Sequence, residues 1–226
     1  MTEYSVKAGS YMYGTNLPTS DVDYRGFFMP TLRSVCGIDQ SEESRVVNNK
    51  DRDEAFWEIR HYVKLCCQAN PNVLETAFAP EDCIVRRTAL ADKILAMRDQ
   101  FLSRRIARTY MGYARGNYLR VLKVGMDKYD GKDTMHLIRL VRTGSEALMA
   151  GKLRVRRPED RDFFLKIRRN EVPWETIKSE FEGHTKLWAK IEADSPLPEE
   201  PDIATISNKV ASIVFENLAS THDWYR

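Results

Sequence analysis

Residues 9–23 read GSYMYGTNLPTSDVD and decide the fold. The Gly9-Ser10 pair ends a short alternating strand predicted at 4–8, and Asp21 and Asp23 follow at the start of a second strand predicted at 22–29. A strand that ends in Gly-Ser and turns into a short helix leaves backbone N–H groups free for a phosphate. Residues two apart on a strand share one face, so both carboxylates are expected side by side.

The chemistry of this stretch favours a metal-bound phosphate group. Gly9 has no side chain to keep a phosphate away, and the Ser10 hydroxyl can add a hydrogen bond. Neighbouring carboxylates such as Asp21 and Asp23 repel each other unless a cation lies between them, and hard oxygen ligands suit Mg²⁺. A Gly-Ser pair alone is usually a turn, and Asp-x-Asp is usually a solvated loop. Their combination at this spacing predicts a magnesium and phosphate site.

The combination resembles the DNA polymerase β-type nucleotidyltransferase superfamily. The longer match, GSYMYGT followed by SDVDYRGFF, is similar to the predicted nucleotidyltransferases called RNA repair pathway polymerase-β-like proteins, found in bacteria and phages. The segments EIRHYV at 58–63 and NPNVLE at 70–75 agree with that subgroup, as does a Lys-x-x-x-His-x-x-Arg-Leu pattern beginning at Lys132. The resemblance covers the chain to about residue 170.

The resemblance implies a reaction and a ligand set. Two Mg²⁺ ions would be held by Asp21, Asp23 and a third acid on a neighbouring strand, with a nucleoside triphosphate (NTP) as substrate. Asp53 is the choice for the third acid, because it begins the predicted strand 53–57 directly before the helix at Glu58. Asp51 and Glu54 are close enough to compete, and a charged loop end is the alternative for each of the three.

Further side chains are candidates for holding the nucleotide beside Gly9 and Ser10. By strand parity Arg25 lies on the face of the aspartates, where it either contacts phosphate or pairs with a carboxylate. Lys132, His136 and Arg139 fall on one face of a helix, where they either grip phosphates or a base or form a structural ion-pair stripe. For Lys132, His136 and Arg139 the resemblance favours the nucleotide-binding role.

The composition bounds the class of protein. The chain has 226 residues, 42% hydrophobic and 30% charged, with a net charge of +2, which fits one compact domain or two closely joined small ones. No apolar run approaches the ~20 residues that cross a bilayer, and the first residues do not resemble a signal peptide. The four cysteines form no Cys-x-x-Cys pair. We therefore expect a reduced cytoplasmic protein, and the resemblance implies a bacterium or a phage-infected cell as its source; its oligomeric state is left open.

The element pattern predicts an α+β fold. A small mixed-sheet nucleotidyltransferase domain is expected over 1–87, and an all-helical domain over 88–226. A helix with one apolar stripe is predicted over 58–69, and Asn70-Pro71 has the pattern of a new helix start. A last short strand is predicted at 83–85, and residues 31–52 are not assigned. Beyond residue 87, helices are predicted at 88–99, 101–123, 133–150, 159–168, 174–191 and 203–219.

The charge is unevenly distributed along the chain. Ten basic residues and two acidic ones lie between Arg86 and Lys123. This favours either a polyanion-binding face or an ordinary solvated helix surface. On the helix predicted at 101–123, tyrosines interleave with arginines, and they could stack the bases of a single-stranded or tRNA-like acceptor or pack between helices. They are Tyr110, Tyr113, Tyr118, Arg108, Arg115 and Arg120.

These features together predict a Mg²⁺-dependent enzyme that moves a nucleoside monophosphate from an NTP to a hydroxyl, with an RNA end as the leading acceptor. Two alternatives stay open. The first is a protein- or small-molecule-modifying nucleotidyltransferase. The second is a nucleotide- or RNA-binding protein, or an inhibitor protein, that keeps this fold without turnover.

Overall fold

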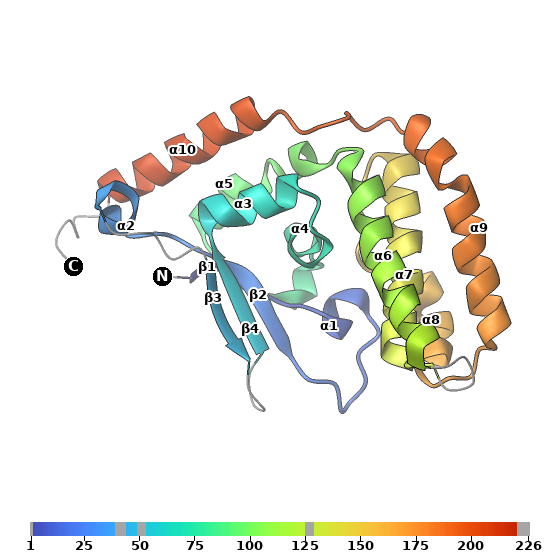
Figure 1. The fold of residues 1–226 in the computed structure, drawn as a ribbon. Coiled ribbons are helices and arrows are strands. Elements are labelled where there is room, and N and C mark those ends of the chain that lie inside the picture. The colour runs from blue at the N-terminus through green and yellow to red at the C-terminus, as the bar shows by residue number, and fades with distance from the viewer. Residues whose placement is uncertain (1, 39–43, 49–52, 125–128, 221–226) are drawn as a thin grey trace.

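A computed structural model describes residues 2–38, 44–48, 53–124 and 129–220. Its amino-terminal part is a five-stranded mixed sheet in the order β3-β4-β2-β1-β5, followed by helices (Figure 1). The strands are β1 (Thr2–Lys7), β2 (Asp23–Phe28), β3 (Ser44–Asn48), β4 (Asp53–Glu58) and β5 (Ile84–Arg87). Strands β2 and β4 run parallel, and the other neighbours are antiparallel. The predicted α+β class is confirmed.

One face of the sheet packs against α3 (Ile59–Cys67), α4 (Pro71–Ala77) and α5 (Ala89–Leu95). The rings of Phe27 and Tyr62 lie 4.8 Å apart, and the Tyr4 hydroxyl donates to the Thr76 carbonyl at 2.8 Å. Because side chains alternate along a strand, Asp23 and Arg25 lie on the same face as Phe27. The face of β2 that is core at Phe27 therefore carries polar side chains at its start.

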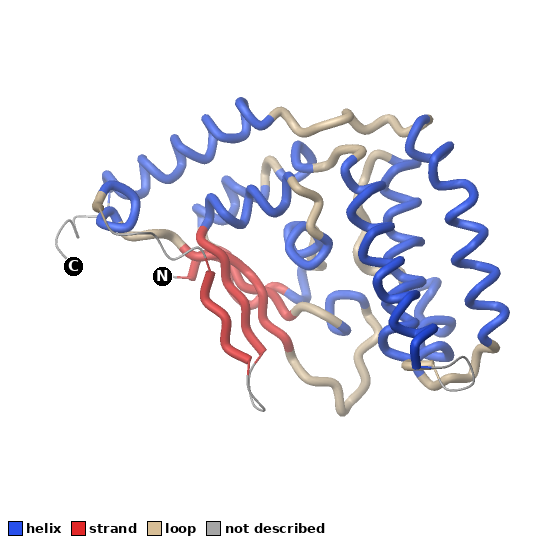
Figure 2. The backbone as a smooth tube through the Cα atoms, viewed as in Figure 1, coloured by secondary structure: helices blue, strands red, loops and turns tan. Residues whose placement is uncertain are grey.

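The helical part is built around α6 (Arg105–Val124) and α7 (Gly131–Ala150), with α8 (Arg161–Arg168) and α9 (Trp174–Ala193) beside α7 (Figure 2). The last helix, α10 (Ile203–Ser220), returns along α5 toward the sheet (Figure 1). Buried side chains from both parts form one continuous cluster. The division of the chain at residue 87 stays a prediction.

Most predicted elements are present, with some different boundaries. Asn70 caps α4 and Pro71 is its first residue, as predicted. The helix predicted at 88–99 ends at Leu95 and is followed by a short 3₁₀ turn, Arg98–Phe101, in which Phe101 is buried. The unassigned segment contains β3 and a short α2 (Leu32–Cys36).

No helix in the described part of the chain combines the length and apolarity that a membrane span requires.

Candidate active site

A cleft of about 470 Å³ opens between the start of β2, the short helix α1 (Ser10–Tyr13) and the first turns of α7. All of the predicted site residues except Asp53 and Arg139 line it. They are Gly9, Ser10, Asp21, Asp23, Arg25, Lys132 and His136. The Gly-Ser turn and the aspartates therefore face the same space, and a cationic side chain of the helical part lies on its other wall.

The Gly9 turn is shaped by the carboxylate behind it. Gly9 has a φ of 58° and a ψ of −134°, a conformation that strongly favours glycine. A Cβ at this position would lie 2.5 Å from Oδ2 of Asp23. The Ala8 amide also donates to the Asp23 carbonyl at 2.8 Å. The backbone of the turn thus packs directly on Asp23, which explains why the two halves of the motif occur together.

The acids are placed by the sheet. Asp23 of β2 and Asp53 of β4 are direct partners in the parallel register. Burial and the charge of Asp53 raise the pKa of Asp23, against the smaller opposing effects of Arg25 and Lys132. Glu54 alternates with Asp53 along β4 and so projects from the other face, and Asp51 lies outside the described residues. Of the described candidates for the third acid, Asp53 is the one beside Asp23.

Asp21 and Arg25 differ in part from expectation. Asp21 is exposed and precedes β2, so the strand-parity argument does not apply to it, although it still lines the cleft. Of the two roles expected for Arg25, the structure shows pairing with a carboxylate. Nη2 pairs with Oδ1 of Asp53 at 2.9 Å, and Nη1 donates to the Asp53 carbonyl at 3.1 Å.

A metal triad is not fully assembled. Among the described residues, no three His, Cys, Asp or Glu side chains are grouped so as to hold a metal ion. The donor chemistry nevertheless fits Mg²⁺, because two carboxylates stand in register and the pKa of Asp23 is raised by burial and by that neighbouring charge.

Arg139 is not in the cleft, and the nucleotide-binding role expected for it needs correction. Its side chain is fully buried, where Nη1 donates to both carboxylate oxygens of Glu75 at 2.8 and 3.0 Å. Its guanidinium also lies 3.7 Å from the centre of the Tyr13 ring. The seven-residue spacing from Lys132 does place it on the same side of α7, but two turns along the helix that side is covered by α4 and α1. The ion-pair alternative is the correct one.

His136 is neutral and has a defined tautomer. Nη2 of Arg139 lies 3.3 Å from Nδ1 of His136, and because a guanidinium can only donate, Nδ1 accepts and the ring proton is on Nε2. Burial, together with the charges of Arg139, Arg120 and Lys132, lowers the pKa of His136 well below its usual value. His136 therefore offers the cleft an N–H donor, whereas Lys132 supplies the positive charge.

Three arginines that sequence reasoning missed hold α1 and the loop after it. Nη2 of Arg156 donates to the Tyr11 carbonyl at 2.9 Å, and Nε of Arg161 donates to the Gly14 carbonyl at 2.9 Å. Nη1 of Arg168 donates to the Thr15 carbonyl at 3.2 Å, and this side chain also lines the cleft. They lie in a basic stretch of the sequence, but nothing in the sequence shows that backbone carbonyls are their partners.

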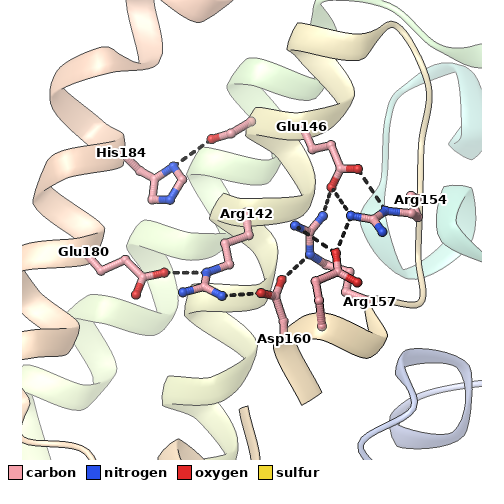
Figure 3. A network of polar contacts seen from close by, with 9 residues as sticks. Arg142, Glu146, Arg154, Arg157, Asp160, Glu180 and His184 are labelled. Atoms are coloured by element: carbon pink, nitrogen blue, oxygen red, sulfur yellow. Dashed lines mark hydrogen bonds and ion pairs between the residues drawn. The ribbon is translucent and has the colours of Figure 1, made fainter. Parts of the chain in front are cut away.

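The segment that carries these arginines is itself tied to α7 and α9 (Figure 3). Arg142 of α7 donates to Asp160 and to Glu180 of α9, both at 2.6 Å. Arg157 pairs with Glu146 of α7 and with Asp160. The network fixes the start of α8 against the helical core and so supports the loop at the cleft.

The comparison with known families agrees with this geometry. The sequence profile of the RNA repair pathway DNA polymerase beta family (RlaP) matches residues 2–161. The chain belongs to this family. The match includes the sheet, the Gly-Ser turn, the acids and the α7 wall of the cleft, and it ends at the start of α8. The resemblance seen in the sequence is confirmed.

A relative in Enterobacteria phage T4, described as an uncharacterised 38.9 kDa protein, is 30% identical over 118 residues. That alignment covers 47% of this chain and 34% of the phage protein, so the chain spans about a third of its relative. No solved structure matches the chain.

Proposed function

We propose that this RlaP family member is a Mg²⁺-dependent nucleotidyltransferase that moves a nucleoside monophosphate from an NTP to a hydroxyl of an RNA end. The observation that carries the proposal is the packing of the Gly9 turn on Asp23, with Asp53 in register beside that carboxylate. The Gly9 turn, Asp21 and Asp23 thus share one cleft, with Asp53 next to Asp23 in the sheet, and this is the arrangement that phosphoryl chemistry requires.

The chain's own groups have distinct roles in this proposal. The backbone N–H groups at the start of α1 and the Ser10 hydroxyl hold the triphosphate. Lys132 offsets part of its negative charge, and the Nε2–H group of His136 donates a hydrogen bond to the nucleotide. Asp21, Asp23 and Asp53 would hold Mg²⁺. When bound, the metal would neutralise phosphate charge and lower the pKa of the attacking hydroxyl.

The proposed reaction is balanced as follows. The acceptor oxygen forms a bond to the α-phosphorus, the bond from that phosphorus to the bridging oxygen of the β-phosphate breaks, and pyrophosphate leaves. The hydroxyl proton passes to a carboxylate of the cleft. The Arg156, Arg161 and Arg168 contacts keep α1 and the two residues after it in place, so the phosphate-binding N–H groups are positioned before the substrate binds.

Label transfer from an α-³²P NTP tests the proposal. The purified protein is given each of the four NTPs with RNA, protein and small-molecule acceptors, with Mg²⁺ or with a chelator. We expect label in RNA only with Mg²⁺, and none with Asp21→Ala or Asp23→Ala. Asp162→Ala, at an exposed acid of α8, is the matched control and keeps full activity. Full activity of the Asp23→Ala protein would refute the proposal.

One observation favours a second candidate, a nucleotide-binding protein without turnover. Arg25 pairs with Asp53 beside the cleft, which lessens the need for a cation at the acids. Under this alternative the protein binds triphosphate without Mg²⁺, and no acceptor becomes labelled with any NTP. Label in protein or in a small molecule, with none in RNA, would instead identify a transferase with a different acceptor.

A further inference from the structure

The exposed side of α6 is a basic surface that adjoins the cleft at Asp133. The twenty residues of this helix include no Asp or Glu. We name its outward side the α6 face and define it by Arg108, Gly112, Tyr113, Arg115, Gly116 and Arg120, all exposed. At 100° per residue these positions share one side of the helix. In Figure 1 no helix or strand lies in front of α6.

The structure separates the aromatic residues of this helix. Tyr110 is fully buried, and the ring of Tyr118 stacks on that of Phe181 at 4.5 Å. Both serve packing, which was the alternative to base stacking. Tyr113 is 39% exposed and lies on the α6 face. It is therefore the tyrosine of this helix that a ligand base can reach.

A groove runs along the α6 face. Arg108, Tyr113 and Arg120 line it, together with two glycines whose missing side chains form its floor. A Cβ at Gly112 or Gly116 would meet no atom within 4 Å, so the helix backbone is open to solvent there. The distance from Arg108 to Arg120 along the helix is about 18 Å, which is room for roughly five stacked nucleotides.

The groove ends at the catalytic cleft. Nε of Arg120 lies 3.8 Å from Oδ2 of Asp133, and Asp133 lines that cleft. The charge of Arg120 also contributes to the lowered pKa of His136 on the cleft wall. A chain lying in the groove would thus reach the site of transfer with its end.

We infer that the α6 face is the binding track of a single-stranded RNA acceptor whose end enters the cleft beside Asp133. This inference rests on the proposed function and names where its acceptor lies. Arg108 and Arg115 have no carboxylate partner among the described residues, and a strand of phosphates supplies such partners at regular spacing. The exposed Tyr113 ring gives one base a stacking surface, and the glycine floor lets the backbone approach closely.

An RNA-binding assay tests the inference separately from catalysis. Fluorescence anisotropy of a labelled ten-nucleotide single-stranded RNA is recorded over a series of salt concentrations. For Arg108→Glu combined with Arg115→Glu, we expect at least tenfold weaker binding. We also expect a shallower dependence of log K on log salt, by about 0.7 for each phosphate that the variant no longer neutralises. The matched control reverses two exposed lysines on α9, Lys186→Glu with Lys190→Glu, and retains wild-type affinity.

A second pair of variants excludes a purely structural explanation. Gly112→Gln with Gly116→Gln fills the groove while keeping every charge, and it raises helix propensity. We expect its melting temperature to rise while RNA affinity falls severalfold. Tyr113→Ala should weaken binding by roughly tenfold, because the ring that stacks on a base is removed.

The results that would overturn this inference differ from the result that would refute the proposed function. Unchanged RNA affinity in the arginine and glycine variants overturns the inference, even if nucleotide transfer is observed. Loss of label transfer to a protein acceptor, with RNA binding unaffected, also overturns it and assigns the α6 face to a protein. Loss of RNA affinity in these variants supports it, whereas failure of Asp23→Ala to affect transfer would refute the proposed function alone.

Discussion

The buried pair of Glu75 and Arg139 offers the sharpest prediction about stability. Both side chains are fully buried and joined by hydrogen bonds of 2.8 and 3.0 Å. Removing one partner leaves the other charge buried without its counter-charge, which typically costs about 3–5 kcal/mol. That is a large part of the roughly 5–15 kcal/mol by which a typical protein is stable. We expect Glu75→Gln to lose stability of this order in urea denaturation followed by tryptophan fluorescence.

The two single variants should respond differently to pH. An arginine keeps its charge at every accessible pH, so the cost of Glu75→Gln should be the same at pH 8 and pH 5. In Arg139→Met the Glu75 side chain stays buried without its counter-charge, and burial disfavours its ionised form. Its unfavourable burial is then relieved as the pH falls and the carboxyl takes up a proton. The cost of Arg139→Met should therefore be smaller at pH 5.

The double variant completes the test. Glu75→Leu with Arg139→Met removes both charges, and we expect it to be clearly more stable than the sum of the single losses implies. A loss below about 1 kcal/mol in both single variants, or additive losses in the double variant, would refute the reasoning that a desolvated ion pair joins α4 to α7. The exposed pair of Lys93 and Glu216 is the control, and Lys93→Met should cost no more than about 1 kcal/mol.

Three further variants test parts of the cleft. Gly9→Ala should lower stability by about 1–2 kcal/mol and weaken triphosphate binding, because Cβ would meet Asp23 and the φ is positive; wild-type values in denaturation and calorimetry would contradict this. The lowered pKa of His136 gives stability that is present above pH ~6.5 and is lost as the pH falls toward the folded pKa. His136→Gln should therefore lose less unfolding free energy than wild type between pH 7.5 and 5.5, although His184, whose pKa is also lowered, keeps its own share. Lys132→Ala should raise the Kd for triphosphate by roughly tenfold without changing stability, because an exposed cation contributes charge and little packing.

The local parts of the fold were predictable from the sequence. Strand β2, the Gly9 turn and the Asn70-Pro71 start of α4 each depend on neighbouring residues, so their patterns are readable in one short window. The parallel pairing of β2 with β4 is not local. Asp53 could be proposed as the third acid from its position before Glu58, but its place beside Asp23 follows from a register that only the folded sheet sets.

The long-range contacts could not be read from the sequence. Glu75 and Arg139 both occur in segments that carry the family resemblance. They are nevertheless 64 positions apart, and no periodicity indicates that they meet. The same holds for Arg168, which reaches the Thr15 carbonyl from the end of α8. Helical spacing gave the correct side of α7 for Arg139, but whether that side is open or covered depends on the packing of α1 and α4.

Calorimetric titration with a non-hydrolysable triphosphate tests whether carboxylates beside the Gly9 turn hold a metal ion, and it needs no acceptor. We expect wild-type protein to bind the triphosphate saturably when Mg²⁺ is present and weakly with a chelator. The Asp23→Asn protein should show at least a hundredfold loss of Mg²⁺-dependent affinity while melting at or above the wild-type temperature, since a half-buried charge next to Asp53 has been removed. Equal affinity in the two proteins, or binding that ignores the metal, would contradict a carboxylate-held metal beside the Gly9 turn.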